Sequence, residues 1–99
     1  MKILFVHQNF PGQYIHIIQR LERQGGHQLV ALSINQLDKS RGLPSSLRHF
    51  QYQLRRGNGE GIHPLVMETE SKVIRAEACA NAAQQLKDQG FIPDLICAH

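Results

Sequence analysis

The sequence predicts a three-layer α/β fold, in which a parallel sheet is covered by helices on both faces. Three runs of consecutive apolar residues, Ile3–Val6, Leu29–Leu32 and Leu95–Ala98, are typical of strands that are buried on both sides. Two segments with helical spacing of apolar residues lie between these runs. Strands that alternate with helices form doubly wound parallel sheets, so residues 1–99 are expected to form a single domain of this kind.

The first unit of the fold is a strand that runs through a glycine turn into a helix. The strand Ile3–Val6 is followed by the polar turn His7–Gly12, and the period changes at Gln13. Four apolar side chains then have the i, i+3, i+4, i+7 spacing of an amphipathic helix: Tyr14, Ile17, Ile18 and Leu21. Gly25-Gly26 is expected to end this helix, because glycine readily adopts the left-handed conformation found at helix C-termini.

The next two strands are expected on either side of a polar loop. Gln28–Ser33 is the second strand, Asn35–Ser46 the loop and Leu47–Leu54 the third strand. In the third strand polar residues alternate with apolar ones, which are Phe50, Tyr52 and Leu54. Alternation indicates that one face meets water, so this strand is expected at an edge of the sheet.

A long helix and a last strand complete the predicted fold. The glycine-rich segment Arg55–Pro64 is expected to be a loop, and a helix follows over Leu65–Gln89. The buried face of this helix is predicted to carry mainly small residues that let it lie close to the sheet: Val73, Ala76, Ala80 and Ala83, with Cys79 and Leu86 beside them. Asp94–Ala98 is the fourth strand. Right-handed crossovers then give the sheet order 3-2-1-4, with strands numbered along the chain.

The strand Asp94–Ala98 is expected at an edge of the sheet, although its residues are typical of a strand buried on both sides. A neighbour for its outer side is therefore expected. That neighbour comes either from a longer protein of which residues 1–99 are an N-terminal fragment, or from another chain. We expect the first alternative, in which residues 1–99 are an N-terminal fragment. If another chain supplies the neighbour, copies of the fragment would self-associate through this strand.

Composition and charge exclude several classes of protein. The chain has 41% hydrophobic residues, 19% charged residues and a net charge of +3, which is ordinary for a globular protein. No apolar run approaches the roughly 20 residues of a transmembrane helix or forms a secretory signal, so a cytoplasmic protein is expected. The chain has no basic stripe with interleaved aromatic residues, so a nucleic-acid partner is not expected. Cys79 and Cys97 are expected to be buried and unpaired.

The residues that follow the first and fourth strands form the candidate site. His7 comes directly after Ile3–Val6, and His99 directly after Asp94–Ala98. Because these strands are neighbours in the predicted sheet, both residues lie at the carboxyl edge, where doubly wound folds bind ligands. The amides of Asn9–Gln13 lie at a helix N-terminus, which suits an anion, and Gly12 lets a ligand approach the backbone.

No complete cofactor or catalytic motif accompanies these residues. The chain has no G-x-G-x-x-G fingerprint, no P-loop and no nucleophile elbow. His7, His63 and His99 do not have the spacing of a known metal site. The residues by themselves therefore predict an α/β ligand-binding unit without a resident cofactor or metal, and they leave the reaction open.

Four stretches form a recognisable set: MKILFVHQNFPGQ at 1–13, GGHQLVALS at 25–33, the pair His63-Pro64, and GFIPDLICAH at 90–99. Together they resemble the N-terminal domain of family 4 glycosyltransferases over essentially the whole chain. The resemblance implies the GT-B fold, in which two Rossmann-like domains face each other across a cleft. Residues 1–99 would then be the first part of the N-terminal domain of such a protein.

The resemblance also implies a reaction and its partners. A sugar is transferred from a nucleotide-sugar donor to an acceptor, with retention of configuration and without an essential metal or cofactor. Five residues around the first turn are expected to bind donor or acceptor: His7, Asn9, Pro11, Gly12 and Gln13. His99 is expected to line the sugar site and is the candidate catalytic residue. His63 matches the family's H-P pair and is expected to contact donor or acceptor.

The N-terminal domain of such enzymes mainly binds the acceptor, so the 99 residues alone are expected to be inactive. A competing hypothesis is a non-catalytic α/β module that recognises an anionic small molecule or assembles through Asp94–Ala98. A cofactor-binding dinucleotide unit is a third hypothesis, and the missing glycine fingerprint counts against it.

Overall fold

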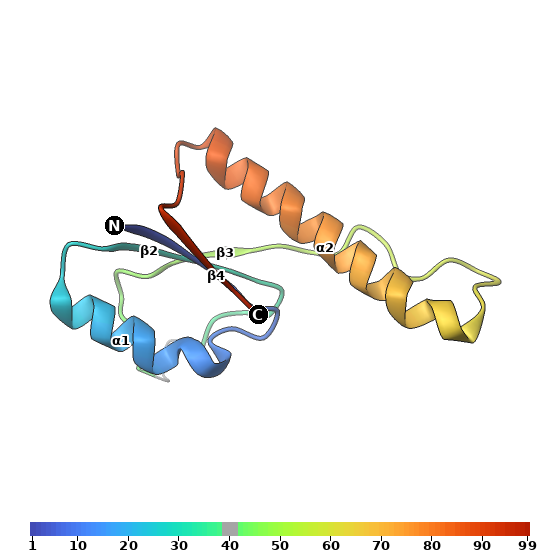
Figure 1. The fold of residues 1–99 in the computed structure, drawn as a ribbon, viewed down its shortest axis with the longest axis horizontal. Helices are drawn as coiled ribbons and strands as arrows, with labels where there is room; N and C mark the ends of the chain where they lie inside the picture. The colour runs from blue at the N-terminus through green and yellow to red at the C-terminus, as the bar shows by residue number, and fades with distance from the viewer. Residues whose placement is uncertain (39–41) are drawn as a thin grey trace.

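The computed structural model describes residues 1–38 and 42–99 and shows a parallel sheet with a helix on each side (Figure 1). Its strands are β1 (Lys2–Val6), β2 (Gln28–Ser33), β3 (Arg48–Gln51) and β4 (Leu95–Ala98). Its helices are α1 (Ile15–Gln24), which continues the 3-10 turn η1 (Gly12–Tyr14), and α2 (Pro64–Asp88). The strands lie in the order β3-β2-β1-β4, which confirms the predicted order 3-2-1-4.

The sheet separates two hydrophobic clusters, because successive side chains of a strand point to opposite faces. From β1, Ile3 and Phe5 join the cluster under α1, while Leu4 joins the cluster under α2. The central strands are therefore buried on both faces, as their uninterrupted apolar runs predict. The two cysteines are free and half-buried, Cys97 beside the first cluster and Cys79 beside the second.

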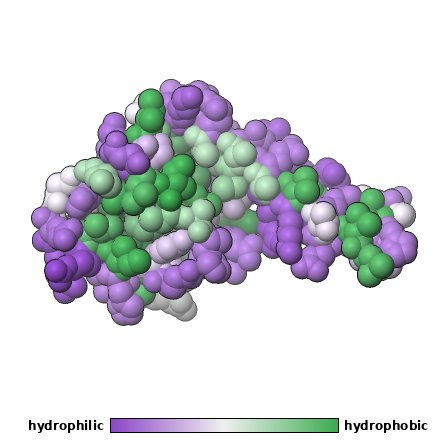
Figure 2. Space-filling model, in the orientation of Figure 1, coloured by the Kyte–Doolittle hydropathy of each residue, from purple (hydrophilic) through white to green (hydrophobic). Residues whose placement is uncertain are grey.

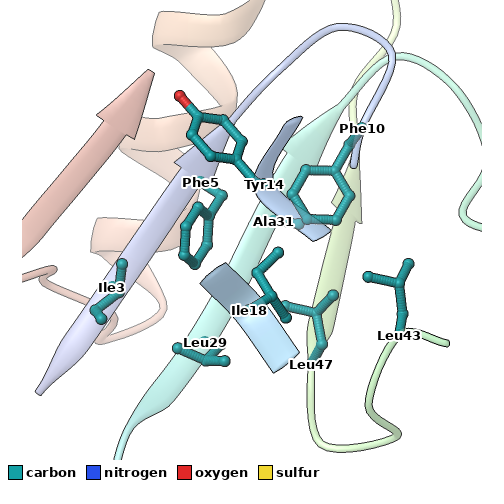
Figure 3. Close-up of a cluster of buried hydrophobic side chains, with 9 residues drawn as sticks. All are labelled: Ile3, Phe5, Phe10, Tyr14, Ile18, Leu29, Ala31, Leu43 and Leu47. Carbon is teal, nitrogen blue, oxygen red and sulfur yellow. The ribbon is translucent and has the colours of Figure 1, made fainter. Parts of the chain in front are cut away.

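The cluster under α1 also holds the turn that follows β1 (Figure 3). The ring centroid of Phe5 lies 5.3 Å from that of Tyr14 and 6.4 Å from that of Phe10. Because Phe10 belongs to the turn, these contacts fix the turn against the sheet. Ile18 is fully buried, whereas Ile17, which was expected in the same stripe, is 51% exposed. The buried stripe of α1 is thus narrower than predicted.

The predicted buried face of α2 is right only in part. Leu86 is buried, and Cys79 and Ala83 pack against the cluster under α2. The side chains that this helix buries follow i, i+4 spacing: Ile74, Ala78, Ala82 and Leu86. Val73 is 58% exposed, and Ala76 and Ala80 are exposed as well. The alanines of α2 lie on two opposite sides of the helix, so spacing alone marks no unique face, and Ile74 and Leu86 select the face because they bury more apolar area. Neither helix in the described part of the chain is long and apolar enough to cross a membrane.

The two edge strands differ in part from their predictions. β4 is not buried on both sides: Leu95 is 48% and Ile96 57% exposed, and Figure 2 shows apolar side chains gathered over this region. Its outer side is uncovered because β4 is the last strand on its side of the sheet. β3 lies at the other edge, as predicted, but it ends at Gln51 because its partner β2 ends at Ser33. Residues 39–41 of the expected loop lie outside the described residues.

Candidate functional site

The sheet register brings His7 and His99 together. Val6 pairs with Ala98, so β1 and β4 end side by side, and the His99 amide donates to the Val6 carbonyl at 2.9 Å. The two imidazole rings stack with their centroids 5.1 Å apart and their planes 7° from parallel. The juxtaposition that the sequence predicted at the carboxyl edge is therefore present in the structure.

The proton on neutral His7 is placed by a neighbouring amide. The Asn9 N–H donates to His7 Nδ1 at 3.0 Å, so the neutral ring carries its hydrogen on Nε2. Burial, and then the charge of His99, lower the pKa of His7 from its usual 6.5. His7 is therefore a neutral donor through Nε2 at neutral pH.

Gly12 packs directly against the His7 ring. A Cβ atom at Gly12 would lie 2.5 Å from His7 Nε2 and 2.8 Å from Cδ2, and the Gly12 φ of +52° is in the left-handed region. The ring of Tyr14 meets that of His7 edge-on, with centroids 6.2 Å apart. The missing side chain at Gly12 thus makes room for the His7 ring. The sequence indicated only that this glycine would let a ligand approach the backbone.

Asn35 holds the turn from the end of β2. Its side-chain Nδ2 donates to the Phe10 carbonyl at 2.9 Å, and its backbone amide donates to the Gln8 carbonyl at 3.3 Å. Phe10 and Pro11 are buried, and the peptide bond between them is cis. Sequence reasoning missed Asn35, although a polar residue just after β2 occupies the same carboxyl edge as His7 and His99.

A cavity of about 430 Å³ opens beside the histidine pair, on the α2 side of the sheet. Arg75 and Lys72 bring basic groups to it from α2, and Arg75 Nη1 donates to Gln8 Oε1 at 2.9 Å. The full lining is Val6, His7, Gln8, Tyr52, Lys72, Arg75, Ala76, Cys79 and His99. Sequence reasoning missed both cations, which are three residues apart and so share one face of the helix.

Tyr52 and Cys79 contribute an uncharged hydroxyl and an uncharged thiol to the cavity lining. Tyr52 is 8% exposed, and burial followed by the neighbouring Cys79 raises the pKa of its hydroxyl to about 12. Burial also raises the pKa of the Cys79 thiol, and a hydrogen bond with Tyr52 opposes that rise. Both groups are thus neutral at physiological pH, and the thiol is not activated as a nucleophile.

The remaining predicted site residues are not all gathered here. The side chains of Asn9 and Gln13 are exposed near the turn. His63 caps α2, since its Nδ1 accepts from the Leu65 amide at 3.2 Å. Arg75 lies twelve residues further along this helix, which is about 18 Å at 1.5 Å per residue, so His63 is far from the cavity. The described residues contain no group of His, Cys, Asp and Glu side chains arranged to hold a metal ion.

The strand order, the helices on both faces and the site at the carboxyl edge define a Rossmann-like α/β fold of the GT-B class, present here in part. The chain is similar to the solved structure of apo UGT2 from Phytolacca americana, with a TM-score of 0.59 and 18% sequence identity. The match covers 97% of this chain and 24% of that one, so the chain spans about a quarter of that protein's length.

The family is defined more closely by sequence. Residues 25–99, about three quarters of the chain, match the family described as the glycosyl transferase family 4 group. The chain therefore belongs to that family. The matched residues include the stretches at 25–33 and 90–99 and the His63-Pro64 pair, while the opening stretch at 1–13 precedes them. No functionally curated protein matches the chain.

Proposed function

We propose that this chain is the acceptor-side N-terminal part of a retaining glycosyltransferase, which transfers a sugar from a nucleotide-sugar donor to an acceptor. Membership of the glycosyl transferase family 4 group supports sugar transfer. The observation that carries the proposal to particular residues is the meeting of His7, His99 and the Gly12 turn. They meet at the carboxyl edge of the sheet, where open α/β folds bind their ligands.

In this proposal the turn Asn9–Gln13 faces the donor diphosphate. The helical backbone begins at Gly12 and continues into α1, and neither η1 nor α1 has an acidic residue in its first turn. The positive end of the helix dipole and its unpaired amides are therefore not neutralised locally. They would stabilise the negative charge that grows on the diphosphate as the bond to an oxocarbenium-like sugar breaks.

His99 is assigned to the sugar and His7 to holding His99. The His7 ring is fixed on one side by the Asn9 amide and packs against Gly12, so its stacking partner His99 has a defined orientation. A group that is oriented before the substrate arrives accelerates transfer by positioning, without entropy loss at the moment of reaction.

We further propose that a longer protein contributes a second domain, and that the 99-residue fragment alone is inactive. In the described part of the chain no carboxylate lines the cavity, and its lining includes the imidazoles of His7 and His99. The remaining donor contacts are therefore assigned to the second domain. The proposed location is the cytoplasm, where the free thiols of Cys79 and Cys97 stay reduced.

The proposal is tested by turnover of the full-length protein, meaning the natural chain that contains these residues. The protein is offered a panel of nucleotide sugars and acceptors, and the anomeric configuration of the product is read by NMR. We expect a retained configuration, a loss of turnover in His99→Ala, and no turnover by residues 1–99 alone. An inverted product, or turnover by the 99-residue chain, contradicts the proposal.

A second candidate function, assembly through β4, is favoured by one observation. Leu95 and Ile96 expose about half of their surface on an edge strand, and such strands readily pair with other chains. Sedimentation of residues 1–99 tests it. A dimer that Ile96→Lys dissociates supports assembly, and a monomer at all concentrations rejects it.

A further inference from the structure

The cavity beside the histidine pair is more basic than the transfer of a neutral sugar requires. Lys72 and Arg75 are both part of its lining, and none of the lining residues in the described part of the chain is acidic. Like charges brought to one concave surface repel each other, and an anion that enters relieves this repulsion. The lining therefore indicates a ligand with negative charge.

Arg75 is held at the cavity by a neutral partner. It is half-buried, and its Nη1 donates to the amide oxygen of Gln8 at 2.9 Å. A guanidinium has five N–H donors, and this bond uses one of them. No carboxylate forms an ion pair with Arg75 in residues 1–38 and 42–99. The group is thus oriented by Gln8 while its charge remains available to a ligand.

Lys72 has a partner that a ligand can replace. Its Nζ lies 3.1 Å from Glu68 Oε1, with the side chains 66% and 79% exposed. An exposed ion pair four residues apart on a helix contributes little to stability, because water screens both charges. The ammonium therefore loses little when it turns from Glu68 to an anion in the cavity.

We propose that the acceptor carries an anionic group, a phosphate or a carboxylate, which Arg75 and Lys72 bind in this cavity. The inference rests on the proposed transferase function and narrows its acceptor to one chemical class. Gly12 is not part of the cavity lining, so the donor diphosphate assigned to the Gly12 turn and the acceptor anion have separate places. Arg75 supplies a planar fork that matches either anion, and Lys72 adds a point charge.

The test is binding of three probes to the full-length protein, followed through the imidazole NMR signals of His7 and His99. The probes are glucose 6-phosphate, glucuronate and glucose, at constant ionic strength. We expect at least one charged probe to bind tenfold or more tightly than glucose, and Arg75→Gln to weaken it at least tenfold. Two control variants, Arg20→Gln at an exposed position of α1 and Lys87→Gln at an exposed position of α2, are expected to leave binding unchanged.

Two results overturn the inference: glucose binds as tightly as both charged probes, or Arg75→Gln and Arg20→Gln weaken binding equally. Comparison of the two charged probes separates phosphate from carboxylate. Thermal unfolding of each variant shows that a loss of binding is not a loss of fold. Because binding is read without turnover, a protein that binds the anion through Arg75 but transfers no sugar rejects the proposed function and retains this site.

Discussion

The substitution Gly12→Ala tests whether the turn after β1 is built around the His7 ring. A methyl group at this position would lie 2.5 Å from His7 Nε2, so the ring must move. A displaced ring loses the hydrogen bond from the Asn9 amide and its parallel stacking on His99. One methyl group is therefore expected to disturb the whole carboxyl-edge site.

The expected loss of stability has two parts. Alanine in the left-handed conformation costs roughly 1–2 kcal/mol, and the lost hydrogen bond adds about 0.5–1.5 kcal/mol. We therefore expect Gly12→Ala to lower the free energy of unfolding by about 1.5–3.5 kcal/mol. At about 4–8 °C per kcal/mol for a domain of this size, the melting temperature falls by at least about 6 °C.

Two glycine controls separate these parts in urea denaturation. Gly61 has a φ of +70° with open space around it, so Gly61→Ala carries the backbone cost alone. Gly57 has neither a positive φ nor a close neighbour, so Gly57→Ala is expected to change stability by less than about 0.5 kcal/mol. If Gly12→Ala costs no more than Gly61→Ala and the His7 imidazole signals do not shift, the reasoning is refuted.

Further predictions concern pH and packing. Because burial raises the pKa of Tyr52 from 10.0 to about 12, the stability that Tyr52 contributes is complete below pH 10 and is lost as the pH rises toward 12. In Tyr52→Phe, the free energy of unfolding is therefore expected to fall less over this pH range. Because burial and His99 lower the pKa of His7, the contribution of His7 is complete above pH 6.5 and is lost as the pH falls through its folded value. In an NMR titration, the pKa of His7 is expected to be higher in His99→Ala than in the unchanged protein. An unchanged pKa would contradict the stacking of the two rings. Leu86→Ala is expected to cost about 2–5 kcal/mol in urea denaturation, and Leu65→Ala, which is 85% exposed, less than about 0.5 kcal/mol; equal costs would contradict the α2 packing.

Most of the fold could be predicted because its central strands are buried on both faces. Ile3–Val6 and Leu29–Leu32 have no polar residue, and such runs separated by helical segments are typical of a parallel sheet covered on both sides. The face of α2 could be predicted only in part, because its alanines lie on two opposite sides of the helix and the choice depends on where Ile74 and Leu86 meet the sheet. The burial of β4 was also predicted wrongly, because an uninterrupted apolar pattern does not distinguish an edge strand with an uncovered side from a central strand.

The candidate site was predictable where it follows from strand order. His7 and His99 directly follow neighbouring parallel strands, so topology alone brings them to one edge. Arg75 and Lys72 come from the middle of a long helix, and their position depends on how that helix crosses the sheet, which sequence spacing does not specify. His63 caps the N-terminal end of the same helix, and Figure 1 shows that α2 extends well beyond the sheet.

Hydrogen exchange of the four backbone amides in residues 9–13, those of Asn9, Phe10, Gly12 and Gln13, in the full-length protein tests the central claim most directly. The claim is that the turn after β1, supported by His7 and His99, forms one wall of a nucleotide-sugar cleft. Exchange is measured with and without nucleotide sugars that the protein turns over. The account predicts slower exchange at residues 9–13 when the donor is bound. Unchanged exchange at these amides, while other parts of the protein become protected, would contradict it.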